Sequence, residues 1–245
     1  MATGLSLVGG EAFRPPADDG PRGEPRERCV WSASEPGAER LPSPAGPTLS
    51  ELFAANARDG GATGFLLAQL DPSRPLLWVQ ERMAILEGGR IYPPGLGPDI
   101  GVELIHVEAR DARAALWAME EGLRCSALGG VIGEIWGDPR VLDFTATRRL
   151  AVAAERSGVP AWLVRLGGSA NLSGARMRWR VGSAPSMANA LDLGAPGEAV
   201  WDAELFRARG AAPGRWVAVR DPENREHLVA VSGDRAVAED ERKRA

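Results

Sequence analysis

Short apolar runs alternate with longer amphipathic stretches between residues 75 and 166. The runs are rich in β-forming residues and are bounded by turn residues, which predicts buried strands. The stretches between them place apolar residues three or four apart, which predicts helices. The predicted strands are 75–80, 102–107, 130–136 and 160–166, and the predicted helices are 111–123 and 145–157. Strands that alternate with helices in this way predict a parallel sheet covered on both faces.

The boundaries of these helices carry recognisable signals. Asp111 is a suitable N-cap for the first helix. Gly158 stands where a left-handed residue can end the second helix, and Pro160 prevents its continuation.

The pattern changes after residue 170, where strand candidates follow one another without helices between them. Residues 176–181 alternate strictly, with arginines on one face and Met, Trp and Val on the other. Residues 215–220 and 226–231 are further strand candidates, joined by good turn residues at 221–225. We therefore expect an α/β fold in which antiparallel strands extend the C-terminal edge of a mostly parallel sheet.

The two ends of the sequence have a different composition. Residues 1–47 are rich in proline and glycine and predict a mostly disordered arm. Residues 236–245 are nearly all charged or small and predict a solvated tail, which leaves 48–235 as the folded domain. We find no run of roughly 20 apolar residues and no secretory signal, so we expect a cytoplasmic protein with no membrane contact.

The amino-acid composition excludes several kinds of metal-binding and catalytic site. The formal net charge is −4, so no strong overall field attracts nucleic acid or anionic lipid. The two cysteines and two histidines exclude Cys-rich zinc modules and disulfide frameworks. Lys243 is the only lysine among 29 basic residues, so no lysine within the predicted domain can serve a P-loop, a Schiff base or general-base catalysis. We expect no cofactor and no metal.

A glycine-rich loop precedes a predicted helix at 65–70. The loop contains Asp59, Gly60, Gly61, Thr63 and Gly64. Loops of this kind at the start of a helix can bind phosphate through backbone N–H groups. The Gly-Lys-Ser/Thr ending of a phosphate-binding loop is missing, which favours an ordinary loop and leaves residual nucleotide binding as the alternative.

Glu134 lies near the end of the apolar strand predicted at 130–136. A carboxylate at that end of a parallel strand can hold Mg²⁺ or act as a base. Contact with solvent or with an arginine is favoured, because no lysine is available and the carboxylates that follow, Asp138 and Asp143, lie in the next loop, where Asp138-Pro139 predicts a turn. His106 and His227 have no G-x-S-x-G serine to complete a catalytic triad, so we interpret both as structural.

Arginines cluster around the strand predicted at 176–181, and they define a candidate partner or DNA surface. Its members are Arg148, Arg149, Arg176, Arg178, Trp179 and Arg180. Arginine clusters can bind a phosphate backbone. The alternative is an edge strand protected from aggregation by charge, and the sequence leaves both interpretations open.

Several blocks of the chain resemble the ImuA family of alphaproteobacteria. They include TLSELFA (48–54), GGRIYPPGL (88–96), RMRWRV (176–181) and, as the most specific, WGDP (136–139) and RRLAVAAERSG (148–158). The resemblance covers about residues 48–235. ImuA proteins are RecA-like, were once labelled SulA-like, and act with ImuB, a catalytically inactive relative of Y-family polymerases. Together with an error-prone C-family polymerase they form an SOS-induced mutasome for translesion synthesis.

The resemblance implies a RecA-like core and a strand at Leu49–Phe53, although Thr48 and Glu51 alone suggest the start of a helix. It puts the loop 59–64 at the P-loop position and Glu134 near a Walker B position. Since Gly-Lys-Thr is absent, we expect no ATP hydrolysis and no enzyme activity. The expected function is a non-catalytic accessory protein of error-prone translesion synthesis that binds ImuB, with the C-family polymerase as an indirect partner. The alternative is a nucleotide-binding regulator, or a modulator of RecA filaments or single-stranded DNA.

Overall fold

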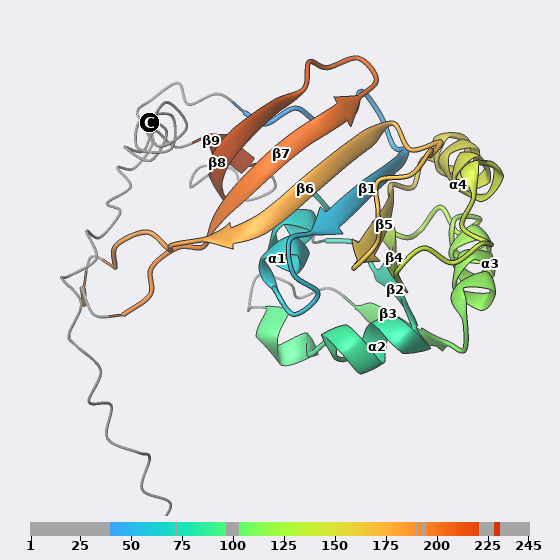
Figure 1. Cartoon of the computed structure of the whole chain (residues 1–245), viewed down its shortest axis with the longest axis horizontal. Coiled ribbons are helices and arrows are strands. Elements are labelled where there is room, and N and C mark those ends of the chain that lie inside the picture. The colour runs from blue at the N-terminus through green and yellow to red at the C-terminus, as the bar shows by residue number, and fades with distance from the viewer. Residues whose placement is uncertain are drawn as a thin grey trace, which may run out of the picture.

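The computed structural model describes residues 40–71, 73–96, 103–189, 191–192, 195–220 and 228–230. Within these residues the chain forms an α/β fold around one nine-stranded sheet, in the order β3-β2-β4-β5-β1-β6-β7-β8-β9 (Figure 1). The strands from β3 across to β6 run parallel to one another, whereas β7, β8 and β9 extend the sheet in antiparallel fashion. The expected fold class is therefore confirmed at this level.

The strands and helices have the following bounds. The strands are β1 (Leu49–Ala54), β2 (Leu76–Glu81), β3 (Leu104–Ala109), β4 (Gly130–Trp136), β5 (Ala161–Leu166), β6 (Met177–Ala184), β7 (Val200–Ala208), β8 (Gly214–Arg220) and β9 (Leu228–Ala230). The helices are α1 (Gly61–Leu67), α2 (Arg82–Gly88), the 3₁₀ turn η1 (Pro93–Leu96), α3 (Ala112–Gly122) and α4 (Phe144–Ser157).

Each face of the sheet has its own apolar core. On one face α1 packs against β1 and β6, and Phe65 contacts both Trp179 and Trp201. On the other face α3 and α4 lie side by side over the parallel strands, with Met119 and Leu150 fully buried beneath them (Figure 1). Strands that are covered by helices on both faces are mostly apolar, which is why most of these strands appear as continuous apolar runs in the sequence.

The predicted signals at the two long helices are confirmed. The Asp111 carboxylate accepts the N–H of Ala114 at 2.8 Å and caps α3. Helix α4 starts one residue earlier than predicted, because the Asp143 carboxylate caps it by accepting the N–H of Ala146 at 2.7 Å. Gly158 ends α4 with φ 73°, a conformation that favours glycine.

Two local predictions are corrected. The helix predicted at 65–70 spans Gly61–Leu67 and begins inside the predicted glycine-rich loop. Its N-cap is Gly60, and the Asp59 carboxylate just before it accepts the N–H of Gly61. The helix start suggested by Thr48 and Glu51 is instead β1, the strand implied by the ImuA resemblance. Tertiary pairing with β5 and β6 overrides the local capping signal.

Parts of the predicted organisation lie outside the described residues. They are the arm up to residue 39, the turn at 221–225, the ends of the strand predicted at 226–231, His227 and the tail at 236–245. The described chain begins at Arg40, and the buried side chain of Leu41 already belongs to the core on the α1 face. None of the helices in the described part of the chain has the length and apolar character that a membrane crossing requires.

A buried ionic cluster joins β1 to its two neighbours. The fully buried Glu51 carboxylate accepts Nε of Arg178 on β6 at 2.7 Å and the hydroxyl of Ser173 at 2.7 Å. Nη1 of Arg165 on β5 approaches the same carboxylate at 4.0 Å. Both guanidinium groups lie over the ring of Phe53, so the cluster is enclosed by an aromatic wall.

Replacing Glu51 by Ala leaves the buried Arg178 guanidinium without its carboxylate and leaves Arg165 with Asp138 alone. We expect the free energy of unfolding to fall by about 3–5 kcal/mol, measured by urea denaturation. The matched control is Glu204→Ala, which removes the partner of the exposed Arg180 and should cost about 1 kcal/mol or less. Equal losses in the two variants would contradict a special role for the buried cluster.

Candidate functional site

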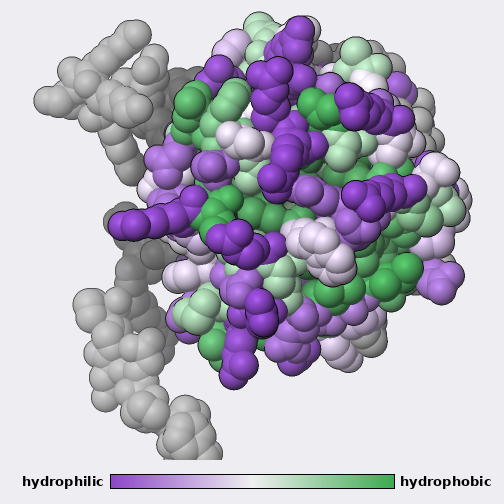
Figure 2. Space-filling model, turned by 90° about the vertical axis from the view of Figure 1, so that its right-hand side faces the viewer, coloured by the Kyte–Doolittle hydropathy of each residue, from purple (hydrophilic) through white to green (hydrophobic). Residues whose placement is uncertain are grey.

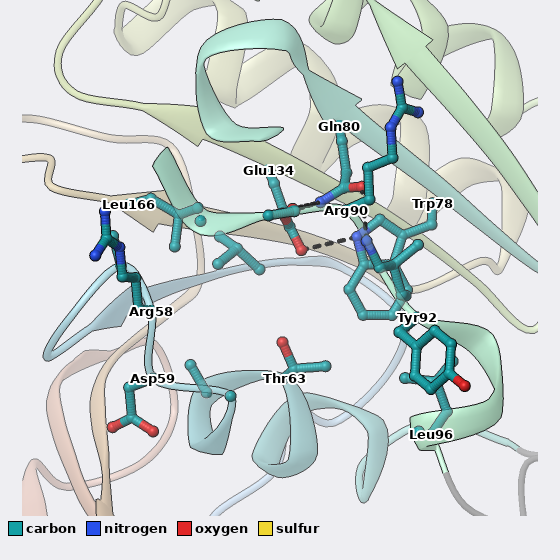
Figure 3. A pocket seen from close by; sticks show the side chains of 18 residues that line it. Arg58, Asp59, Thr63, Trp78, Gln80, Arg90, Tyr92, Leu96, Glu134 and Leu166 are labelled. Atoms are coloured by element: carbon teal, nitrogen blue, oxygen red, sulfur yellow. Dashed lines mark hydrogen bonds between the residues drawn. The ribbon is translucent and has the colours of Figure 1, made fainter. Parts of the chain in front are cut away.

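A pocket of about 280 Å³ lies at the carboxyl edge of the parallel strands, on the α1 face of the sheet (Figure 3). Trp78 and Glu134 project into it from β2 and β4, and Thr63 from α1. Tyr92 and Leu96 close it on the side of η1. In α/β folds ligands bind at this edge, where loops leave the strand ends. The predicted glycine-rich loop and Glu134 are thus brought together in one site.

The loop between β1 and α1 is tied down by its own carboxylate. Asp59 accepts the N–H of Gly61 at 2.8 Å and the N–H of Ser183 at 2.8 Å, as well as the Ser183 hydroxyl. A side chain at Gly61 would collide with the Ser183 hydroxyl, which explains the glycine at that position. Asp59 therefore occupies the place beside the helix start that an anionic ligand would take, and it links the loop to β6.

The hydrogen bonds to Asp59 determine its charge state. Partial burial acts to raise the pKa of the Asp59 carboxyl, but the hydrogen bonds from Ser183 and from the Gly61 N–H outweigh it and hold the pKa below its usual value. The carboxylate therefore stays ionised at neutral pH. A second anion beside it would be repelled.

Glu134 is buried and already hydrogen-bonded. Its two oxygens accept Nε1–H of Trp78 at 2.9 Å and Nε2–H of Gln80 at 2.7 Å (Figure 3). Burial raises the pKa of the Glu134 carboxyl, and the hydrogen bonds from Gln80 and Trp78 oppose this only in part. The expected contact with solvent or an arginine is not seen, since the partners are a tryptophan and a glutamine from the neighbouring strand.

Gln80 connects Glu134 to the rim of the pocket. Its amide also donates to the Gly89 carbonyl at 3.1 Å, and its oxygen accepts the Ile91 N–H at 3.1 Å. Nε2 of His106 lies 3.0 Å from the same oxygen. His106 therefore has a structural contact. The network orders the segment that follows α2, which carries the aromatic and aliphatic side chains on that side of the pocket.

Positive charge reaches only the rim of the pocket. Arg58 donates to the Glu87 carbonyl at 3.4 Å, and Arg90 forms an ion pair with Glu108 at 2.6 Å. Both arginines are exposed. A search of the described residues finds no group of three or more His, Cys, Asp or Glu side chains that could hold a metal ion. The pocket thus combines an apolar wall, one buried carboxyl and peripheral arginines.

The six residues predicted as a partner or DNA surface are dispersed by the fold. Trp179 is 0% exposed and packs between Phe65 and Trp216, and Arg178 is 3% exposed in the buried cluster. Both are therefore interior residues: Arg178 lies on the face of β6 that turns towards Glu51, and Trp179 lies on the opposite face, in the core beneath α1. The edge-strand alternative is wrong as well, since β6 lies between β1 and β7.

The other four members are at or near the surface. Arg176 pairs with Glu155 at 2.7 Å, Arg180 pairs with Glu204 at 3.1 Å, and Arg149 pairs with Glu120 at 2.7 Å. Arg148 and Arg176 line one hollow beside α4, whereas Arg149 faces another hollow on the opposite side of that helix.

Several pocket residues were not singled out from the sequence. Gln80 ends the apolar run predicted as a strand at 75–80, and a polar residue at the end of such a run is a usable signal. Arg90, Tyr92 and Leu96 sit in a connection without periodicity, so nothing in the local pattern points to them.

Comparison with known proteins adds no assignment. No protein-family model matches the chain, and no curated protein sequence matches it.

Glu134 should make stability depend on pH. Because its pKa in the folded chain lies above the ordinary value of 4.5, the folded state binds the proton more tightly than the unfolded state. The free energy of unfolding should therefore fall as pH rises from about 4.5 to the folded pKa, by at most about 1.4 kcal/mol per pH unit from this group.

Urea denaturation between about pH 5 and pH 8 checks this for the full chain and for Glu134→Gln. The difference in stability between the two should shift in favour of the variant as pH rises. Glu198→Gln, which changes an exposed carboxyl elsewhere, should follow the unmodified chain. If the free energy of unfolding of all three proteins changes with pH in the same way, titration of Glu134 does not contribute to the pH dependence.

Proposed function

We propose that this chain is a non-catalytic, RecA-like accessory protein of the ImuA kind. In this role it acts in the cytoplasm, binds an ImuB-type inactive Y-family polymerase and supports an error-prone C-family polymerase during SOS translesion synthesis. The observation that carries the non-catalytic part is the Asp59 carboxylate, which lies beside the helix start and accepts the N–H of Gly61 there and the N–H of Ser183 from β6. The choice of partner rests on the resemblance of residues 48–235 to ImuA.

The composition and the site agree with a protein without ATPase chemistry. Phosphoryl transfer depends on cations that neutralise the developing charge. Lys243 is the only lysine, and it is far in sequence from the glycine-rich loop. Glu134, at the position where the resemblance implies a Walker B carboxylate, accepts hydrogen bonds from Trp78 and Gln80.

The architecture supports the RecA-like part of the proposal. The first strand of the parallel sheet lies between β5 and β6, and the chain passes from it through a glycine-rich turn into α1. Glu134 stands near the carboxyl end of β4, at the same edge of the sheet as that turn. An ancestral nucleotide site that has lost its function would retain such an arrangement while its polar groups became paired within the chain.

The proposal predicts a stable complex with the ImuB-type polymerase of the same organism, independent of nucleotide. Size-exclusion chromatography of the mixed full-length proteins should give the same complex with and without Mg·ATP. The melting temperature of the chain alone should not change with ATP concentration.

Two other outcomes of these experiments would point to different conclusions. Absence of a complex under both conditions would overturn the accessory role. A complex that requires ATP, or a melting temperature that rises with ATP and no longer does so in Arg58→Ala, would favour the nucleotide-binding regulator.

A further inference from the structure

Two hollows flank the N-terminal half of α4 on the face opposite the pocket. The first, which we call the α4–β7 hollow, has a volume of about 510 Å³ and contains Phe144, Arg148, Arg176, Arg207 and Arg209 among its lining residues. The second, the α3–α4 hollow, has a volume of about 570 Å³. Its lining includes Arg113, Trp117, Arg140 and Arg149.

The two hollows adjoin each other across one helix. Phe144 and Arg148 line the first hollow, and the next residues in the sequence, Thr145 and Arg149, line the second. The two hollows are therefore separated by about the diameter of a helix with its side chains, roughly 10 Å. Figure 2 looks onto this side of the molecule, where strongly hydrophilic side chains project between apolar patches.

Most arginines of this face have no acidic partner. Arg113, Arg140, Arg148 and Arg207 form no ion pair and no side-chain hydrogen bond with any residue that the structure describes, and Arg209 has only a longer-range attraction to Glu155. They are therefore available to an external anion.

The carboxylates of the same face are already engaged. Asp143 caps α4, Glu120 pairs with Arg149, and Glu155 pairs with Arg176. Arg209 lies close enough to Glu155 to contribute to the lowered pKa of that carboxyl. The face thus carries excess positive charge although the whole chain has a net charge of −4.

Two large aromatic side chains stand among these arginines. Trp117 on α3 is 65% exposed, and Phe144 at the start of α4 is 39% exposed. An exposed tryptophan leaves apolar area in water unless a ligand covers it. Unpaired arginines that alternate with exposed rings form the combination that binds single-stranded nucleic acid, because cations hold the phosphates and rings stack on unpaired bases.

We infer that the face formed by α3, α4 and the end of β7 binds single-stranded nucleic acid. In this assignment Arg148, Arg207 and Arg209 contact phosphates in the α4–β7 hollow, and Arg113 and Arg140 contact them in the α3–α4 hollow. Trp117 and Phe144 stack on bases. A duplex fits less well, since its bases are stacked on one another and cannot cover the two rings. This binding activity is additional to the accessory role and does not depend on the polymerase partner.

Fluorescence anisotropy with a labelled oligothymidine of about 20 nucleotides tests the inference on the full chain. Binding should weaken as salt rises from about 50 to about 200 mM, with a log–log slope of about −0.7 for each phosphate contacted. Arg148→Glu combined with Arg207→Glu should weaken binding about tenfold or more and make the slope shallower. Trp117→Ala should weaken binding about tenfold without changing the slope.

The matched control is Arg82→Glu, which reverses an exposed arginine on α2 that lines neither hollow. It should bind like the unmodified chain, and thermal unfolding should show that all variants are folded. Should the first double variant fail to fold, Arg113→Glu with Arg140→Glu makes the same test in the other hollow. A matching oligouridine distinguishes DNA from RNA as the natural strand.

Lack of oligonucleotide binding at low salt would overturn the inference, as would equal weakening by Arg82→Glu. The polymerase complex gives a separate readout. If the arginine variants lose the ImuB-type partner while the unmodified chain binds no oligonucleotide, the face is a protein interface instead. If they keep the partner and lose the oligonucleotide, the inference stands.

Discussion

The Glu51 carboxylate is the contact on which the arrangement of the sheet depends most. It accepts a hydrogen bond from Arg178 and lies near Arg165, and it reaches these side chains from the strand between theirs. A slip of β6 by one residue would set Glu51 opposite an apolar side chain and send the arginine to the other face. We interpret the cluster as a device that fixes register, since a buried ion pair adds little stability compared with apolar residues of similar size.

The same strands connect the pocket to the antiparallel part of the sheet. Asp59 ties the loop after β1 to Ser183 on β6, while on the other side of the sheet β6 pairs its Arg180 with Glu204 of β7. The loop is thus held to β6 by a contact within the chain.

Much of the fold could be predicted from the sequence, because parallel strands and amphipathic helices leave strong periodic signals and Asp111 and Gly158 mark helix ends. The exceptions involve contacts between distant residues. Strict alternation in 176–181 identified a strand with an arginine face, but no local pattern could reveal that Glu51, 127 residues away, covers Arg178. Of the candidate site, the loop and Glu134 were found, whereas their pairing with Ser183, Trp78 and Gln80 was not. Trp117 had a usable signal, since it lies off the helix face that carries Leu116 and Met119.

The central position of β1 in the sheet has a consequence for the nascent chain during its synthesis on the ribosome. Its hydrogen-bonding neighbours, β5 and β6, are among the later strands to be translated, and β5 begins only at Ala161. At typical elongation rates the nascent chain carries an unpaired β1 for on the order of 10 s. During that time the apolar Leu49, Leu52 and Phe53 have no sheet to enter, so this short segment is where chaperones would engage the emerging polypeptide.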